Sequence, residues 1–153
     1  HIWVIRKNED GKYDILLQKR SACKDSNPGC YDISSAGHVA AGDDYLPSAV
    51  RELEEELGIK TSPDKLHFAG FHQGGFRDVF HGKPFADYEI SAVYTYEEPV
   101  KIEELTLQKT EVEEVIWMEL EDCRKKILCG ELKNCIYLDE LDLLEEYLAE
   151  QKN

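Results

Sequence analysis

Three glutamates, Glu52, Glu55 and Glu56, form the part of this sequence best suited to chemistry. Their offsets of three and four residues place all three carboxylates on one side of a helix. Like charges this close repel one another, at a cost of roughly a few tenths of a kcal/mol for each exposed pair. Because Mg²⁺ and Mn²⁺ prefer hard oxygen ligands, binding of either ion relieves the repulsion. The alternative interpretation is a solvated acidic face without a ligand.

The same segment carries an apolar face that predicts how this helix is anchored. Pro47 suits the first helical residue, and Gly58 suits the position at which the helix ends. Between them, four apolar side chains recur at helical spacing: Ala49, Val50, Leu53 and Leu57. We therefore expect one side of the helix to pack in a core while another side presents the carboxylates.

The glutamates belong to a longer pattern of constrained positions. It reads glycine, five residues, an acid, seven residues, and then Arg-Glu-apolar-any-Glu-Glu-any-Gly-apolar, and it is filled here by Gly37, Asp43, Arg51, Glu52, Leu53, Glu55, Glu56, Gly58 and Ile59. The pattern resembles the signature of the Nudix hydrolases and is far more specific than a lone glycine motif. One position departs from it, because the family usually has Glu where Asp43 stands; the change removes a methylene and keeps the charge.

The resemblance implies a set of metal ligands and a cofactor. It assigns metal ligation to Glu52, Glu55 and Glu56, together with the backbone carbonyl of Ala36, and it implies Mg²⁺ or Mn²⁺ as the ion. The same three carboxylates would then be catalytic, because a bound metal makes water easier to deprotonate and stabilises charge on the leaving oxygens.

Other signature residues are expected to position the carboxylates. Arg51 would orient them through ion pairs, with an ordinary surface bridge to Glu55 as the alternative. Gly37 begins the signature loop, and Asp43 either sits at the rim of the metal site or only anchors that loop.

Four further candidates lie outside the glutamate cluster. Glu89 is the best candidate for a general base or an extra metal ligand; the alternative is an acid on a strand that only faces solvent. His38 would ligate metal or contact phosphate; the alternative is a hydrogen-bonded structural histidine. Lys19 and Arg20 would contact substrate phosphates; the alternative is that both are only solvated at the surface.

A glycine-bearing segment supplies aromatic side chains as well. Phe76, with Phe80 and Phe85, can stack on a base or a prenyl group of a substrate. The alternative is that these rings pack in the core.

A second resemblance is more specific and comes from the first forty residues. Gln18-Lys19-Arg20-Ser21 followed by Tyr31-Asp-Ile-Ser-Ser-Ala-Gly-His38 is similar to the isopentenyl-diphosphate-isomerase-like branch of the Nudix family, with Tyr31 in place of the usual Trp. True isomerases carry a catalytic Cys where this chain has Ser34 and Ser35, and serine is a poor proton donor for carbon chemistry without special activation.

The expected activity is hydrolysis of a diphosphate bond in a small molecule, such as a nucleoside diphosphate derivative. The net charge of −14, from 18 basic and 32 acidic residues, means that a diphosphate must be neutralised by metal before attack. The same charge repels a polynucleotide backbone, so no nucleic-acid partner is expected. The alternatives are an isopentenyl diphosphate isomerase and a non-catalytic ligand-binding Nudix module; intact carboxylates argue against the second.

Strands alternating with helices, and a hairpin at the start, predict an α/β fold with a mixed sheet between helices. The resemblance implies a Nudix α/β/α sandwich, with one domain over residues 1–153. Expected strands are Ile2–Arg6, Asp14–Arg20, Tyr31–Val39, Leu66–Phe71, Asp87–Tyr96 and Glu113–Met118, and further helices are Glu119–Cys129 and Tyr137–Glu150. His72–Pro84 is expected to be a long flexible loop.

Composition bounds the remaining properties. Five cysteines, an odd number without a CxxC motif, favour reduced thiols and a cytoplasmic location. There is no run of 18 apolar residues, so no membrane association is expected. Because dimers are common in the resembled family, a homodimer is an expectation from the resemblance alone.

Overall fold

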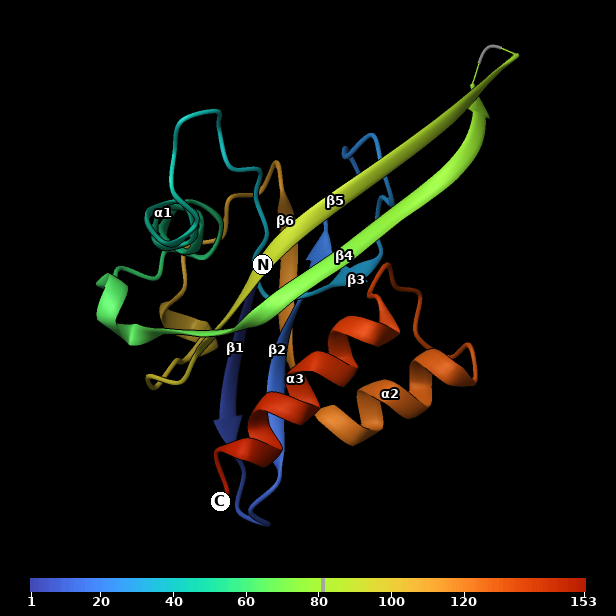
Figure 1. Ribbon diagram of the computed structural model, residues 1–153. Coiled ribbons are helices and arrows are strands. Elements are labelled where there is room, and N and C mark those ends of the chain that lie inside the picture. The colour runs from blue at the N-terminus through green and yellow to red at the C-terminus, as the bar shows by residue number, and fades with distance from the viewer. Residues whose placement is uncertain (81) are drawn as a thin grey trace.

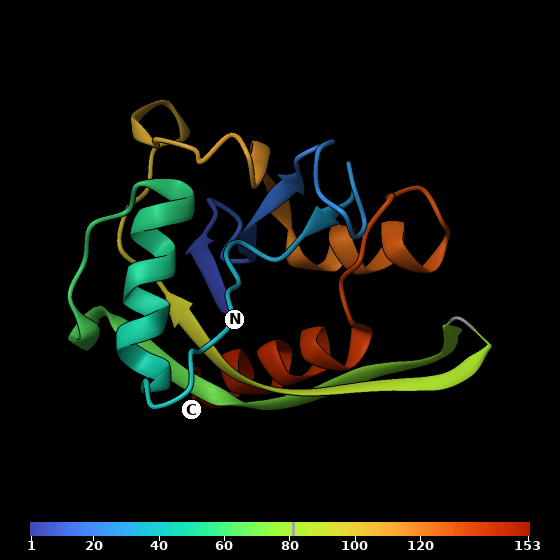
Figure 2. The same ribbon diagram turned by 90° about the horizontal axis from the view of Figure 1, so that it is seen from above.

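A mixed sheet of six strands separates one helix from two others, which gives an α/β/α sandwich (Figures 1 and 2). The computed structural model describes residues 1–80 and 82–153, without the side chains of residues 76–80 and 83–88. The strands are β1 (Ile2–Lys7), β2 (Tyr13–Arg20), β3 (Tyr31–Asp32), β4 (Leu66–Phe80), β5 (Lys83–Tyr96) and β6 (Val112–Glu119). The α-helices are α1 (Tyr45–Leu57), α2 (Leu120–Leu128) and α3 (Leu138–Glu150), and short 3₁₀ turns span Pro63–Lys65 and Ile102–Glu104.

Strand β1 lies in the middle of the sheet. The strand order is β3-β2-β1-β5-β4, and the sixth strand, β6, also pairs with β2. Strands β1 and β5 are parallel and the other pairs are antiparallel. The four residues Ile2–Ile5 are at most 1% exposed, because both faces of this strand are covered.

The side-chain alternation of β1 divides the core between two layers. Val4 packs under α1, in a cluster that includes Leu53 and Leu57 of that helix. Trp3 points to the opposite face and packs with Leu141 and the rest of the α2 and α3 core. No helix in the described parts of the chain is long and apolar enough to cross a membrane.

Helix α1 ends where the sequence predicts but begins earlier. It starts at Tyr45, so Pro47 stands in its first turn, where backbone N–H groups lack helical partners in any case. It ends at Gly58, whose φ of 72° is left-handed. The N–H of Ile59 then donates to the carbonyl of Leu53 at 3.2 Å, as in a Schellman cap.

The expected loop over His72–Pro84 is wrong. Strand β4 continues to Phe80 and β5 begins at Lys83, so the segment is a long antiparallel hairpin that projects from the body (Figure 1). Gly74 and Gly75 suggested a loop, yet both pair with β5. A Cβ at Gly74 would come within 3.3 Å of the Tyr137 ring, so glycine there allows close packing instead of a turn.

The strand expected over Tyr31–Val39 is also too long. Only Tyr31–Asp32 pair with β2, followed by a single bridge between Ser35 and Ile2. Past that bridge the chain leaves the sheet and leads through a loop to α1.

The cap of α1 gives a stability prediction. Gly58→Ala places a Cβ about 2.9 Å from the Thr106 backbone and side chain, in addition to the roughly 1–2 kcal/mol cost of a left-handed alanine. Gly11→Ala is the matched control, since Gly11 has a φ of 76° and open space around it. We expect Gly58→Ala to lower the free energy of unfolding by at least about 1 kcal/mol more than Gly11→Ala, measured by urea denaturation. Equal losses would contradict tight packing at Thr106.

Candidate active site

The site lies in a cavity of about 1060 Å³ beside the central strands of the sheet. Ile2 of β1, Arg20 of β2 and Tyr94 of β5 are among the residues that line it. Residues from α1, the loop before it, β5 and the start of α3 line this cavity, so side chains from both helical layers reach it.

Helix α1 directs its carboxylates into the cavity. Glu52, Glu55 and Glu56 all line it, while Leu53 and Leu57 turn into the core. Glu56 is 6% exposed, whereas about half of the Glu55 side chain is exposed. The predicted division of the helix into an apolar side and a carboxylate side is thus what the structure shows.

Glu56 is held by a residue that the sequence analysis passed over. The side-chain amide of Gln18 on β2 donates to Glu56 Oε2 at 2.7 Å and to the Ser34 carbonyl at 3.0 Å. Gln18 is itself 5% exposed. The available signal was an uncharged polar residue directly after the apolar run Ile15–Leu17 of this strand, because a buried amide needs partners.

The two inner carboxylates oppose each other's ionisation. Burial raises the pKa of Glu56 to about 8, and the adjacent Glu52 acts in the same direction, while hydrogen bonds from Gln18 and the Ala36 backbone oppose the rise. Burial, followed by the charge of Glu55, also raises the pKa of Glu52. At neutral pH the pair therefore needs a proton or a cation.

Gly37 leaves room for Glu52. A Cβ at Gly37 would overlap the carboxyl group of Glu52, so any other residue would push that carboxylate away. Ala36 lines the same part of the cavity.

Arg51 bridges two acids at the outer end of the site. Its guanidinium lies 3.7 Å from Asp43 Oδ2 and 3.8 Å from Glu55 Oε1. All three side chains are about half exposed, so each ion pair is weak. The bridge to Glu55 is the surface alternative stated for Arg51, and the contact with Asp43 was not expected. That Arg51 orients the metal-site carboxylates stays a prediction.

Glu89 and His38 meet on the opposite wall. Glu89 lines the cavity and lies 3.7 Å from Nδ1 of His38, at half exposure. The His38 side chain is 91% exposed, which contradicts the alternative of a hydrogen-bonded structural histidine. Both groups are free to meet a ligand.

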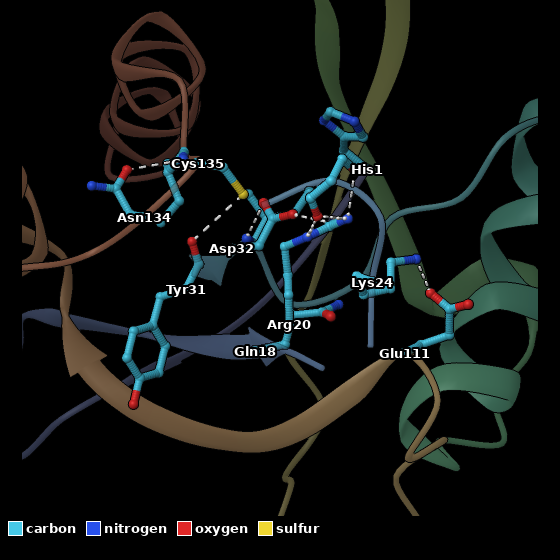
Figure 3. A network of polar contacts seen from close by, with 12 residues as sticks. His1, Gln18, Arg20, Lys24, Tyr31, Asp32, Glu111, Asn134 and Cys135 are labelled. Carbon is cyan, nitrogen blue, oxygen red and sulfur yellow. Dashed lines mark hydrogen bonds and ion pairs between the residues drawn. The ribbon is translucent and has the colours of Figure 1, made fainter. Parts of the chain in front are cut away.

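Of the two basic residues expected to contact the substrate, Arg20 lies at the cavity and Lys19 does not. Arg20 lines the cavity, with its guanidinium 3.3 Å from Asp32 Oδ2 and bonded to the Ser26 carbonyl at 2.9 Å (Figure 3). Lys19 is not among the cavity-lining residues in the described part of the chain, and its ammonium group lies 3.6 Å from Glu113. The structure therefore supports the surface alternative for Lys19.

A further ion pair in the cavity had no signal in the sequence. Lys24 binds Glu111, and both line the cavity (Figure 3). They are 87 residues apart, and neither belongs to a motif.

The expected aromatic side chains Phe76, Phe80 and Phe85 lie outside the described side chains, so their role stays a prediction. The aromatic group that the structure shows comprises Tyr45, Phe68 and Phe71, with ring centroids 5.9 Å apart for Tyr45–Phe71 and 5.1 Å apart for Phe68–Phe71. All three rings are largely exposed, and Tyr45 lines the cavity.

A profile of the NUDIX domain matches residues 1–135 of the chain. This chain belongs to the Nudix family. It is 37% identical over 122 residues to an uncharacterized Nudix hydrolase of Clostridium acetobutylicum, and the aligned region covers 80% of this chain and 56% of that protein. It is 43% identical over 128 residues to Nudix hydrolase 3 of Arabidopsis thaliana, and the aligned region covers 81% of this chain and 16% of that protein. The chain thus spans about half or less of the length of these Nudix relatives.

Solved Nudix structures share the fold. A Caenorhabditis elegans Ap4A hydrolase in a binary complex aligns with a TM-score of 0.58 and 24% identity, over 99% of this chain and 94% of the other. The NUDIX domain of Shewanella oneidensis NrtR, complexed with ADP ribose, aligns with a TM-score of 0.64 and 15% identity, over 96% and 84% of the two chains.

The Nudix family generally uses divalent metals, and the residues of this chain fit such an ion. The donors on α1 are carboxylate oxygens, which suit a hard divalent cation. The raised pKa of Glu56 shows that its charge is undercompensated by the protein alone.

The ionisation of Glu56 gives a pH prediction for the metal-free protein. Because its pKa is about 8 in the fold and near 4.5 in a model peptide, the folded state binds the proton more tightly, and stability falls as pH rises between these values. Glu56→Gln removes that charge and still accepts the Gln18 hydrogen bond. We expect the variant to exceed wild type in free energy of unfolding by roughly 1 kcal/mol or more at pH 9, and by much less at pH 5, in urea denaturation with chelator present. A gain of equal size at both pH values would contradict this assignment.

Proposed function

We propose that this chain is the catalytic unit of a hydrolase that cleaves a diphosphate bond in a small molecule, such as a nucleoside diphosphate derivative, with Mg²⁺ or Mn²⁺ as cofactor. Its matched relatives are named Nudix hydrolases. The proposed unit comprises residues 1–153, since the carboxyl-terminal α3 completes the core and the cavity wall.

The observation that supports the proposal best is the pair of carboxylates on the cavity wall, Glu56, which is buried, and Glu52, which is partly buried. A solvated acidic face, the alternative for this cluster, would leave Glu56 in water, yet it is 6% exposed and bonded to Gln18. Burying a carboxylate costs several kcal/mol unless it is partnered. That cost makes sense where the pair holds a cation.

Glu52 and Glu56 would hold the metal, with Glu55 at the more exposed edge. When bound, the ion would neutralise diphosphate charge and make water more acidic. Gln18 keeps the Glu56 carboxylate oriented, Gly37 keeps the space beside Glu52 free, and the aliphatic face of α1 fixes the helix to the sheet.

Glu89 is the proposed general base. It faces the cavity from β5, across from α1, and its half-exposed carboxylate can take a proton from water without breaking a buried contact. His38 beside it can accept that proton or contact a phosphate. On the far wall, Arg20 can contact substrate phosphate while Asp32 keeps its guanidinium in place.

The exposed rings beside α1 suit the part of the substrate that carries no phosphate. Tyr45 lines the cavity and Phe71 stands edge-on to it, so a base or an apolar group attached to the diphosphate can pack there. Phe76 stays a proposed contact for the same group.

We also propose that the chain belongs to the isopentenyl-diphosphate-isomerase-like branch. The residues behind that resemblance have physical roles here. Gln18 binds Glu56, and Ser34 joins two strands, accepting from the Val4 N–H at 2.8 Å and donating to the Leu16 carbonyl. Ser34 and Ser35 are fully buried, so neither can protonate a substrate in the cavity, which argues against isomerase activity.

Two further expectations stay proposals. Free thiols at all five cysteines support a cytoplasmic location. A homodimer rests on the resemblance alone.

The decisive experiment is a screen of nucleotide sugars, dinucleotides, prenyl diphosphates and thiamine diphosphate for hydrolysis with Mg²⁺ or Mn²⁺. We expect turnover that vanishes in excess chelator. Glu52→Gln and Glu56→Gln should each lower kcat/KM at least about 100-fold, while Glu54→Gln, an exposed neighbour on α1, should leave it unchanged. Binding of a diphosphate without turnover of any compound would favour the non-catalytic module. Wild-type rates in Glu56→Gln would remove it from the metal site.

Isopentenyl diphosphate separates hydrolase from isomerase. Isomerisation needs an acid and a base on the two sides of the alkene, and the buried serines supply no acid. We expect no dimethylallyl diphosphate in proton NMR spectra after incubation with Mg²⁺, and at most slow phosphate release. Steady formation of the isomer would overturn the assignment.

A further inference from the structure

A second group of metal-ligating side chains lies on the other face of the sheet from α1. It comprises His1 at the start of β1, His72 on β4 and Glu140 on α3, which runs alongside β4 (Figure 2). His72 is 5% exposed and Glu140 is 1% exposed. One ligand atom from each residue lies within 4.8 Å of the other two.

Neighbouring groups aim these side chains at one another. His72 places Nε2 2.8 Å from Asp139 Oδ1, and His1 places Nε2 3.2 Å from the hydroxyl of Ser91. The other ring nitrogen of each histidine, Nδ1, therefore faces Glu140. Nδ1 of His1 lies 2.9 Å from Glu140 Oε2, and Nδ1 of His72 lies 3.7 Å from the same oxygen. A histidine whose outer nitrogen is held by a carboxylate is the usual arrangement around a bound metal.

The inner nitrogen of His72 faces the carboxylate of Glu140 without a hydrogen bond to it. Nδ1 of His72 lies 3.7 Å from Glu140 Oε2, which is too long for a hydrogen bond, while Nε2 is held by Asp139 at 2.8 Å. Both His72 and Glu140 are almost fully buried, and burial of polar groups is favourable only when they are partnered. An ion beside Nδ1 of His72 would supply such a partner.

We propose that His1, His72 and Glu140 form a second metal site, for a transition-metal dication of the Zn²⁺ class. Two imidazoles and one carboxylate are a common Zn²⁺ donor set and are softer than the all-oxygen set on α1. Ligands about 2.0–2.1 Å from a tetrahedral ion stand roughly 3.3 Å apart, and the observed 2.9 and 3.7 Å bracket that spacing.

The remaining coordination position would face the cavity, since all three residues line it. The indole N–H of Trp3 donates to Glu140 Oε1 at 3.1 Å, which leaves Oε2 for the ion. Binding would release the proton now shared between His1 and Glu140. The main-chain nitrogen of His1 donates to the Ala92 carbonyl at 2.9 Å and takes no part in the site. The site stands independently of the proposed hydrolase activity.

The test is a titration of the metal-free chain with Co²⁺, read by its visible absorption, and with Zn²⁺ in competition with a chromophoric chelator. The background is the triple variant Glu52→Gln, Glu55→Gln, Glu56→Gln, which removes all three carboxylates of the α1 site. We expect one equivalent of Co²⁺ with a tetrahedral or five-coordinate spectrum to bind in this background. A spectrum that disappears with the α1 carboxylates would overturn the proposal.

Three substitutions in the same background assign the ligands. His72→Gln should abolish the Co²⁺ spectrum, whereas His67→Gln, an exposed histidine on the same strand, should leave it unchanged. Asp139→Asn, at an exposed position, should weaken Zn²⁺ binding about 10–100-fold, because it loosens the hold on His72. An unchanged Co²⁺ spectrum in His72→Gln would overturn the proposed site. If His72→Gln does not fold, Asp139→Asn provides the test, and an unchanged Zn²⁺ affinity in that variant would overturn the site.

Discussion

The hydrogen bond from Gln18 to Glu56 is the contact on which the architecture of this site depends. A buried carboxylate is costly unless it is solvated by protein groups, and Gln18 meets that need while its second N–H joins the Ser34 carbonyl. One amide thus ties β2, the segment after β3 and α1 together. The same packing brings Glu52 against Gly37, which excludes a side chain at that position. The geometry of the carboxylates is therefore set by the sheet beneath them as much as by their helix.

The cavity explains how polar groups reach the middle of a well-packed fold. It is lined by Ile2, while the next residues of β1, Trp3 and Val4, are fully buried in the core. The cavity touches both helical layers, with carboxylates from α1 on one face and Glu140 from α3 on the other. Helices on opposite faces of a sheet can in this way contribute to one cavity.

Charge balance around the cavity favours anions that arrive with metal. The chain has a net charge of −14, and the cations that face the cavity are already engaged, Arg20 by Asp32 and Lys24 by Glu111. These pairs fix the position of the cations but reduce the positive charge available to a diphosphate. A divalent ion on the α1 carboxylates, as proposed, would supply the missing charge, and the Nudix family generally uses divalent metals.

The sequence by itself determined the features that depend on local spacing: the acidic and apolar sides of α1, its end at Gly58, and the mixed α/β class. Tertiary structure decided what depends on distant partners. Gln18 and Glu56 are 38 residues apart, and His1 and Glu140 are 139 apart. The sequence predicted strands at both ends of the hairpin, but the loop predicted over His72–Pro84 was wrong because cross-strand pairing and a neighbouring ring overrode the loop preference of its glycines. Local propensity contains no information about such partners, since only the folded chain brings them together.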